Sequence, residues 1–386
     1  MQTAYVFQKT VGDAMDETGR AVLQTSDDCY VIAGGTSSYG AGNNQPYLIK
    51  LRPNGDTVWT RRAQTYMTAI ATCISQLSTG GFVIGGASSS FSAPIFPPTY
   101  GFLNTTDSIG QKLLDKSFAF YGKETVFSAV LPAAGGGFFC GGTSIPMGKP
   151  DTCKMLAVKI SAAGDSVWVK TIGQGYDGII GSTGTLTADG GFCIAGNKEA
   201  LAIVGGGIPP NNLYVVKFNG SGDTVWTKSI GYPLYSHGYS IALTSDQGFI
   251  IAGDAATTSP PDTSAYVVKL TSTGATQWTQ RLRTASGSCH GRSVRQTADG
   301  GYIITGFTNV NTANGLDVYL ARLDASGTTQ WSTTFGGAKN DIGYGVTAAH
   351  DGGFIVVGET SSYGQGKNDM YIIKTDAQGK TGPAPK

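Results

Sequence analysis

The sequence has little charge and no long apolar run. Only 14% of its 386 residues are Asp, Glu, Lys or Arg, and the formal net charge is +1. No run of basic residues is present that could hold phosphate groups, which argues against a nucleic-acid partner. No apolar stretch approaches the roughly 18 residues that a membrane-spanning helix needs. Sustained 3.6-residue periodicity is also missing, so long helices are not expected.

Cysteine is scarce, and its spacing does not suit a metal. The cysteines show no Cys-x-x-Cys pair and share no position in the repeat described below, so we expect small buried side chains. A hairpin disulfide between Cys140 and Cys153 stays open. We expect neither a metal nor a cofactor. The six cysteines are Cys29, Cys73, Cys140, Cys153, Cys193 and Cys289.

Glycine, by contrast, is abundant, with 57 residues. Together with frequent Ser, Thr and Asn, this composition favours many short strands joined by tight turns. No secretory leader is visible at the N-terminus, where the segment from Gln2 to Tyr5 already has the character of a strand. We expect a mature secreted chain whose leader has been removed and which carries an added initiator Met.

A unit of about 50 residues recurs along the chain. Alignment on the aromatic residue that follows a glycine turn gives spacings of 52, 55, 54, 58, 52 and 53 residues, hence seven units. This period is typical of propeller blades rather than of solenoid repeats of roughly 20 to 40 residues. The aligned positions are Phe7, Trp59, Leu114, Trp168, Trp226, Trp278 and Trp331.

Each unit predicts four short strands. The first, GYGVTAA in the last unit, ends at an Asp-Gly turn that suits a tight hairpin. The second, such as GFIVVGE, is apolar almost throughout, as expected for a strand buried on both faces. The third ends in Lys or Arg (YIIK, YVVK, YLAR), and the fourth carries the Trp. Small residues two apart on the first strand, such as Gly343 and Gly345, suit the crowded centre of a ring of blades.

The seventh unit lacks its fourth strand, because the chain after Gly379 reads KTGPAPK. The N-terminal TAYVFQKTVG supplies the missing strand, with Phe7 at the Trp position. We therefore predict an all-β, seven-bladed β-propeller of four-stranded antiparallel blades, closed by the N-terminal strand completing the last blade. We assign residues 1–379 to this single domain and 380–386 to a linker that leads to a missing partner domain.

The segment around Asp324, Ser326, Gly327 and Trp331 resembles the tryptophan-docking motif of quinoprotein dehydrogenase propellers. That resemblance implies that the five blade tryptophans pack between adjacent blades. The whole unit, with W-x-x-x-[FI]-G, D-G-G-[FY]-I-[IV]-x-G and Y-[IV]-[IV]-K, is similar to repeats of secreted Bacteroidota proteins, which often carry a C-terminal sorting domain. The resemblance covers the chain and implies the fold, but it implies no ligand.

Function is expected on one face of the ring. The loops between the fourth and first strands and between the second and third strands open around the channel mouth and vary in length, whereas the opposite turns are nearly constant. Aromatic, charge-poor loops there suit stacking on sugar rings or docking of a peptide, although the same rings suit packing of the loops onto the blades. The candidate ligand-binding residues are Phe91, Phe96, Tyr100, Tyr66, Tyr121, Tyr176, Tyr232 and Tyr235.

Four polar residues are candidates for lining the channel mouth. His237 and His290 precede the same strand in units five and six, while Asp341 and Glu17 stand one step earlier in units seven and one. Adjacent positions on a strand point to opposite sides, so the two sets should diverge and ordinary polar lining is favoured over a metal site. His350 lies in a turn of the far face, where we expect it to be solvated.

Several enzyme classes do not match the sequence. There is no adjacent cysteine pair as in quinoproteins, no Gly-x-Ser-x-Gly elbow, no His-Glu-x-x-His pair and no P-loop. The Trp follows the turn glycine by four positions, whereas sialidase Asp-boxes place their aromatic at three. Carboxylate pairs for glycoside hydrolysis stay open, because they converge only in three dimensions.

A tripeptide of Asp, Ser or Thr, and an aliphatic residue recurs in the turn before the fourth strand. It resembles an O-glycosylation acceptor of Bacteroidota, and it also suits ordinary turn chemistry. These tripeptides begin at Asp56, Asp107, Asp165 and Asp223.

The first hypothesis is a monomeric, non-catalytic, secreted or cell-surface module that binds carbohydrate or protein at the long-loop face. It predicts an aromatic mouth without strongly perturbed carboxylates. The second is a polysaccharide-active enzyme, which needs two carboxylates or a metal at the channel entrance. The third is a structural spacer in a larger surface protein.

Overall fold

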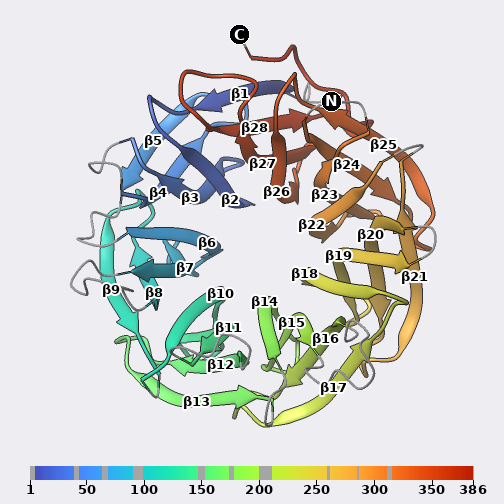
Figure 1. Cartoon of the computed structure of the whole chain (residues 1–386). Helices are drawn as coiled ribbons and strands as arrows, with labels where there is room; N and C mark the ends of the chain where they lie inside the picture. Colours follow the sequence, from blue (N-terminus) through green and yellow to red (C-terminus); the bar gives the residue numbers. More distant parts are fainter. Residues whose placement is uncertain are drawn as a thin grey trace.

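The protein, described here from a computed structural model, consists of 28 β-strands, and no helix occurs among the residues that the structure describes. Within that part, no helix is long and apolar enough to cross a membrane. Figure 1 shows the strands grouped into sheets that are arranged radially around a central axis. The described residues are 5–38, 43–62, 68–89, 99–120, 122–146, 153–173, 178–199, 211–258, 261–284, 287–310 and 315–385.

The strands form seven groups of four, which we number as blades in chain order. Blade 1 contains β2 (Glu17–Gln24), β3 (Tyr30–Thr36), β4 (Gln45–Leu51) and β5 (Thr57–Arg62). Blade 2 contains β6 (Thr68–Gln76), β7 (Phe82–Ser89), β8 (Thr99–Thr106) and β9 (Lys112–Phe118). Blade 3 contains β10 (Glu124–Pro132), β11 (Phe138–Ile145), β12 (Lys154–Ile160) and β13 (Ser166–Ile172).

The remaining blades follow the same order. Blade 4 contains β14 (Gly178–Leu186), β15 (Phe192–Glu199), β16 (Asn211–Phe218) and β17 (Thr224–Ile230). Blade 5 contains β18 (Tyr235–Leu243), β19 (Phe249–Thr258), β20 (Pro261–Leu270) and β21 (Thr276–Leu282). Blade 6 contains β22 (Cys289–Gln296), β23 (Tyr302–Thr308), β24 (Asp317–Leu323) and β25 (Thr329–Phe335). Blade 7 contains β26 (Asp341–Ala348), β27 (Phe354–Thr360), β28 (Asp369–Thr375) and β1 (Phe7–Val11).

Each blade is an antiparallel meander whose first strand lies nearest the axis (Figure 1). Blades 4 and 5 are joined by a single parallel pair between Asn211 and Tyr235, so they share one eight-stranded sheet. The second and third strands are buried almost throughout, as in β3, whereas outer strands such as β5 alternate between exposed and half-buried positions. The apolar second strand of each repeat is therefore the centre of its blade.

The last blade is closed by the N-terminal strand, which confirms the prediction from the incomplete seventh unit. β1 pairs antiparallel with β28, from Phe7 opposite Lys374 to Val11 opposite Met370. The segment after β28 also contacts β1, because the Thr381 hydroxyl donates to the Phe7 carbonyl at 3.0 Å. Residues next to the predicted 379/380 boundary thus contact the propeller, and the boundary itself stays a prediction.

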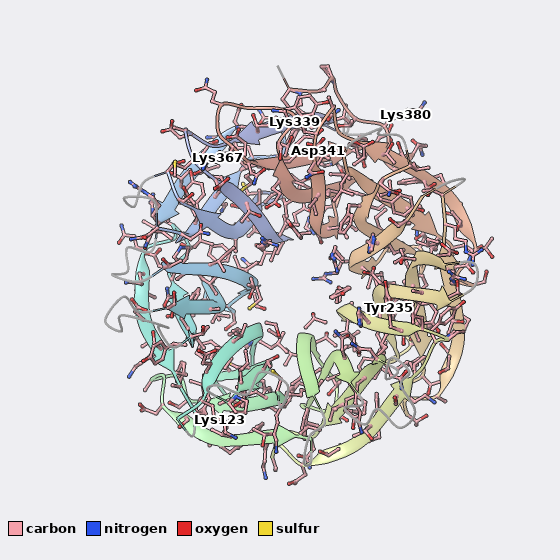
Figure 2. The ribbon with its side chains drawn as sticks, in the orientation of Figure 1. Lys123, Tyr235, Lys339, Asp341, Lys367 and Lys380 are labelled. Carbon is pink, nitrogen blue, oxygen red and sulfur yellow. The ribbon has the colours of Figure 1, made fainter. Side chains whose placement is uncertain are left out.

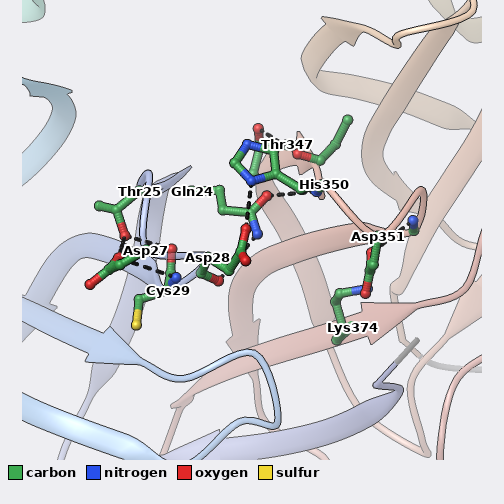
Figure 3. Close-up of polar contacts among 11 residues, drawn as sticks. Gln24, Thr25, Asp27, Asp28, Cys29, Thr347, His350, Asp351 and Lys374 are labelled. Carbon is green, nitrogen blue, oxygen red and sulfur yellow. Dashed lines mark hydrogen bonds and ion pairs between the residues drawn. The ribbon is translucent and has the colours of Figure 1, made fainter. Parts of the chain in front are cut away.

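Blades 7 and 1 are also joined on the far face, where the turns between first and second strands lie (Figure 3). The His350 backbone N–H donates to the Gln24 side-chain oxygen at 2.8 Å, and His350 Nδ1 lies 2.7 Å from Asp28 Oδ1. His350 is 61% exposed and Asp28 53% exposed, so this contact is a solvated one. It adds a second connection at the point where the ring closes.

In six blades the outer strand carries an aromatic residue that packs on a turn glycine of the next blade, and in blade 2 Leu114 takes this place beside Gly164. An ideal Cβ on Gly222 in blade 4 would lie 2.8 Å from the ring of Trp168 in blade 3, and Gly222 has a φ of +82°. Only glycine satisfies both the turn and the close approach of the ring. The five tryptophans that lie between blades in this way are Trp59, Trp168, Trp226, Trp278 and Trp331.

The cysteines are small parts of the packed interior. None of the six forms a disulfide, so the bond considered between Cys140 and Cys153 is not present. Cys73 is half-buried and the other five are buried. Burial raises the pKa of the Cys73 thiol to about 12, which makes a reactive thiolate unfavourable.

Candidate functional site

A β-bulge interrupts the first strand of every blade, and in six blades the bulge side chain lies toward the axis. In β2, for example, the pairing with β3 shifts between Gly19 and Ala21, and Arg20 is the extra residue. Bulges re-aim side chains in this manner and recur at functional sites. The bulge residues line a central cavity of about 370 Å³, which we call the central channel. The channel-lining bulge residues are Arg20, Thr72, Ser128, Tyr239, Arg292 and Tyr344.

In blades 1, 5, 6 and 7 small residues flank the bulge, and the first of them, a glycine, faces the preceding blade. A Cβ on Gly291 would lie 2.9 Å from the Gly253 carbonyl oxygen of blade 5. A Cβ on Gly19 would lie 3.2 Å from atoms of Val357 and Met370 of blade 7. Blade-to-blade crowding therefore explains the small residues two apart. The large residue between them was missed by the sequence reasoning, although its position was recognisable from those small neighbours.

Blades 5 and 6 bring aromatic and cationic groups together beside the channel. We call the five residues Tyr235, His237, Tyr239, His290 and Arg292 the mouth cluster. Tyr235 stacks on His237 with ring centroids 4.7 Å apart, and the Tyr239 hydroxyl lies 3.0 Å from His237 Nδ1. The Arg292 guanidinium lies 4.1 Å from the centre of the Tyr239 ring. Figure 2 labels Tyr235, the first residue of β18, the inner strand of blade 5.

Asp254 organises the blade 6 half of this cluster. Its Oδ2 lies 2.9 Å from His290 Nδ1, and its Oδ1 accepts the Gly291 backbone N–H at 3.0 Å. Arg292 lies 3.8 Å from the same carboxylate. Asp254 is only 3% exposed, so its carboxylate interacts with these partners rather than with solvent. It holds His290 in place and is not available to a ligand.

His237 is held as a neutral ring. Burial lowers its pKa, and the charge of Asp254 only partly offsets that effect. Its Nε2 is buried and has no hydrogen-bond partner among the described residues. With Nδ1 beside the Tyr239 hydroxyl and Nε2 buried, this neutral, stacked imidazole supports the neighbouring tyrosines.

A second aromatic and cationic pair lies at blades 7 and 1, next to blade 6 in the ring (Figure 1). The Arg20 guanidinium lies 3.9 Å from the centre of the Tyr344 ring. The Tyr344 hydroxyl donates to Glu359 Oε1 at 2.9 Å, and Arg20 is 4.0 Å from the same carboxylate. The channel therefore carries two Arg–Tyr pairs on four consecutive blades, 5, 6, 7 and 1.

Glu17 and Asp341 are buried between blades, apart from the two histidines. Glu17 is 1% exposed, accepts from the Thr36 hydroxyl at 2.5 Å and also accepts the Asp13 backbone N–H at 2.9 Å. Asp341 accepts from the Gly337 backbone N–H at 2.8 Å and from the Ser362 hydroxyl at 2.7 Å. Each carboxylate anchors a loop to its blade. No group of three or more metal-ligating side chains occurs in the described part of the chain.

Two of these anchors have a second carboxylate beside them. A Cβ on Gly336 would lie 2.2 Å from Asp317 Oδ1 and 2.7 Å from Asp341 Oδ2, so both acids adjoin this glycine. Asp369 and Glu17 adjoin Gly12 in the same manner. Burial raises the pKa of Asp317, and the charge of Asp341 raises it further. Sequence reasoning did not find Asp317 or Asp369, because they begin third strands rather than first strands.

We expect Asp317→Asn to stabilise the protein by about 1 kcal/mol at pH 7, since Asp317 Oδ1 is buried without a hydrogen-bond partner in the described residues. A raised pKa means that the folded state binds the proton more tightly, so stability falls as pH rises from the unfolded-state pKa through the folded-state pKa. The gain should therefore disappear below about pH 4. Urea unfolding of both proteins at pH 7 and at pH 3.5 measures it, and a variant that is less stable at pH 7 would contradict the prediction.

The predicted aromatic residues are only partly brought together. Tyr235 belongs to the mouth cluster. Tyr232 instead packs on Tyr266 with ring centroids 5.4 Å apart, beneath Arg281, and Tyr100 is half-buried in β8. Five of the residues lie outside the described part of the chain, namely Phe91, Phe96, Tyr66, Tyr121 and Tyr176.

Similarity to solved structures agrees with the architecture. The chain is similar to the GH93 α-L-arabinofuranosidase of Fusarium graminearum (TM-score 0.53, 8% identity, 78% of this chain and 92% of the other). It is also similar to the β-propeller domain of the Trilobed protease from Pyrococcus furiosus (TM-score 0.50, 8% identity, 95% and 100%). A third is Sqt1 from Chaetomium thermophilum (TM-score 0.50, 10% identity, 99% and 86%).

No model of a protein family matches the chain, and no curated protein matches it in sequence. At identities of 8 to 10%, the likenesses to solved structures concern the fold alone. The chain is a β-propeller repeat protein, and its activity has to be argued from its own residues.

Proposed function

We propose that the protein is a non-catalytic binding module that holds a carbohydrate at the channel mouth, on the face of the variable loops. The observation that carries this proposal is the mouth cluster, in which Tyr235, His237 and Tyr239 form a ladder of rings beside Arg292. Exposed faces of aromatic rings stack on the apolar faces of sugars, and the phenol and guanidinium groups supply directional hydrogen bonds.

The state of the carboxylates favours binding over hydrolysis. Glycoside hydrolysis needs two carboxyl groups that both reach the substrate, about 5 to 10 Å apart. The paired acids here, Asp317 with Asp341 and Asp369 with Glu17, are at most 7% exposed. Asp254 is buried and occupied by His290 and Gly291. In the described part of the chain, the acids near the mouth thus support loops and strands.

A polysaccharide-active enzyme is the second candidate. The raised pKa values of Asp317 and Asp369 are the observation in its favour, since perturbed carboxyl groups often mark catalytic sites. Their burial between blades argues against it. A protein ligand at the same face and a purely structural spacer role are the remaining alternatives, and the experiment below separates them from a lectin-like role.

We infer a secreted or cell-surface location and a monomeric state. The inference is supported by the similarity of the repeat unit to those of secreted Bacteroidota proteins and by the tryptophan positions that the quinoprotein-like motif implies. The same similarity suggests a C-terminal sorting domain as a partner. The Asp-Ser/Thr-aliphatic tripeptides stay candidates for glycosylation, and Thr57, Ser166 and Thr224 are exposed.

A glycan-array screen of the purified chain tests the proposal, with a Tyr235→Ala, Tyr239→Ala double variant beside it. We expect the wild type to bind and the variant to lose at least tenfold in affinity, because stacked rings contribute much of the energy of such sites. Tyr5→Ala is the matched control, because Tyr5 is a 48% exposed tyrosine that takes no part in the mouth cluster.

Each result has a distinct meaning. Loss of binding in the double variant alone, with unchanged thermal unfolding, supports the mouth cluster. Equal binding by all three proteins places the site elsewhere. Cleavage of a bound glycan would replace the binding role by the enzymatic one, and an array without any bound glycan would contradict the carbohydrate proposal.

A further inference from the structure

The central channel carries an excess of positive charge. Its described lining includes three arginines, Arg20, Arg292 and Arg295, and neither Asp nor Glu. The chain as a whole has a net charge of only +1, so this concentration is local. Charge of one sign inside a low-dielectric concavity attracts the opposite charge more strongly than it does on an open surface.

Two of the three arginines lie near a carboxylate. Arg20 is 4.0 Å from Glu359, and Arg292 is 3.8 Å from Asp254. These distances are long for ion pairs, and both carboxylates are bonded more closely to other groups, namely Tyr344 and His290. Each guanidinium thus keeps hydrogen-bonding capacity toward the channel. The Nε of Arg20 is buried without any partner in the described part of the chain.

Arg295 has no counter-charge within the described residues. Its Nη1 donates to the Val294 carbonyl at 2.7 Å and lies 3.4 Å from the Ser240 hydroxyl, and no other hydrogen bond or ion pair of its guanidinium is present there. Burial lowers its pKa, with no nearby acid to oppose that effect. A desolvated guanidinium without an anion is costly, and arginine stays charged at neutral pH.

The position of Arg295 is unusual within the ring. The seven first strands superpose through their bulges, and Leu23, Ser75, Leu131, Thr185, Ala242 and Thr347 stand at the corresponding place in the other blades. Only blade 6 has a charged residue there, and the same strand also carries Arg292, three residues earlier. The repeat itself therefore does not require this arginine.

We propose that the central channel binds an oxyanion, a carboxylate or sulfate group, between Arg295 and Arg292 of blade 6 and Arg20 of blade 1. Guanidinium groups present parallel N–H donors that match the two oxygens of such groups. The hydroxyls of Tyr239, Thr72 and Ser128 lie in the same lining, so the wall beside the arginines is polar. The volume of about 370 Å³ accommodates an acidic sugar residue as well as a free ion.

The oxyanion that this site binds can come from two sources. The anion can be free in solution, or it can be the acidic group of a glycan held at the mouth. The second source rests on the function proposed above, whereas the anion site itself does not. It would make the preferred ligand an acidic carbohydrate, with uronic acid or sulfate ester groups.

Isothermal titration calorimetry in a low-salt buffer at pH 7 tests the site with sodium glucuronate, sodium sulfate and uncharged glucose. We expect both anions to bind the wild type and glucose to bind at least tenfold more weakly. Arg295→Gln should weaken the anions about tenfold or more, because each charge-assisted bond contributes strongly. Arg295→Lys keeps the positive charge but lacks the parallel N–H donors of a guanidinium. Its anion affinity should therefore lie between those of the wild type and Arg295→Gln.

Arg52→Gln is the matched control, because Arg52 is exposed in a turn of the opposite face and outside the channel lining. Equal anion affinity in Arg295→Gln and the wild type would overturn the proposal, and so would an absence of anion binding to the wild type. Thermal unfolding of each variant shows that it is folded. If Arg295→Gln does not fold, the glucuronate-against-glucose comparison on the wild type and on Arg20→Gln decides.

An oligosaccharide of uronic acids separates the two sources. Binding at least tenfold tighter than glucuronate, with the gain lost in the Tyr235→Ala, Tyr239→Ala variant, assigns the anion to a glycan held at the mouth. Equal affinity for monomer and oligomer assigns the site to a free anion. If the anions bind but no glycan on the array does, the channel site is supported and the carbohydrate function is contradicted. If a glycan binds but the anions do not, only the channel site is contradicted.

Discussion

A chain that lacks residues 1–11 is expected to unfold roughly 10 °C or more below the full-length protein, or to fail to accumulate in soluble form. β1 covers the outer edge of β28, and its loss would leave that buried strand with an unpaired edge. It would also remove the contact between Phe7 and Gly55 of blade 1, in which a Cβ on Gly55 would lie 3.0 Å from the Phe7 ring. Thermal unfolding followed by circular dichroism measures the effect.

A shorter truncation is the control for this prediction. Removing residues 1–5 takes away only the chain before β1, where Tyr5 is 48% exposed, and should change the unfolding temperature little. A synthetic peptide of residues 1–12, added to the longer truncation, should restore part of the stability by strand addition. Equal stability of the two truncated chains would show that β1 does not close the ring.

Replacing Asp351 by alanine is expected to cost about 3 to 5 kcal/mol, the usual effect of leaving a buried charge without its partner. Lys374 is completely buried in β28, and its ammonium lies 2.8 Å from Asp351 Oδ2 (Figure 3). Its other hydrogen bond within the described residues goes to the Thr375 carbonyl, at 3.0 Å. Urea unfolding at pH 7 gives the change in the free energy of unfolding.

Two further variants make this result specific. Asp165→Ala breaks an exposed pair with Lys116, in which the atoms are 3.9 Å apart, and should cost less than about 0.5 kcal/mol. The double variant Asp351→Ala, Lys374→Met should recover much of the loss, because it removes the buried charge together with its partner. A double variant as unstable as Asp351→Ala would mean that Asp351 acts through the turn it belongs to rather than through Lys374.

The architecture could be predicted because it is repeated. The seventh unit has no fourth strand after Gly379, and the N-terminal segment around Phe7 has the character of one. This predicted that β1 closes the ring, which the pairing with β28 confirms. The turn Asp and the basic end of the third strand were recognised separately in the sequence. The structure shows that they are partners, as in Lys269 with Asp246 at 2.8 Å and Lys374 with Asp351 at 2.8 Å. Their separation of 23 residues along the chain, which these two pairs share with Asp27 and Lys50 and with Asp299 and Arg322, was the unused signal.

The site was harder to predict, because it depends on the direction of single side chains. Strand alternation placed Glu17 and His237 on opposite sides, but it could not show that Glu17 is buried under the Asp13 loop. It also could not show that a bulge turns Arg20 and Tyr239 into the channel, since a bulge breaks the alternation from which side-chain direction is inferred. Aromatic residues in long loops offered no repeat on which to base a position.

Hydroxyl-radical footprinting of the chain, with and without the tightest ligand from the array, tests the central claim most directly. If the ligand is held at the channel mouth, Tyr235, Tyr239 and Tyr344 should become protected, while Tyr5 and His350 near the far face should react as before. Protection of Tyr5 and His350, with unchanged reactivity of Tyr235, Tyr239 and Tyr344, would contradict the account.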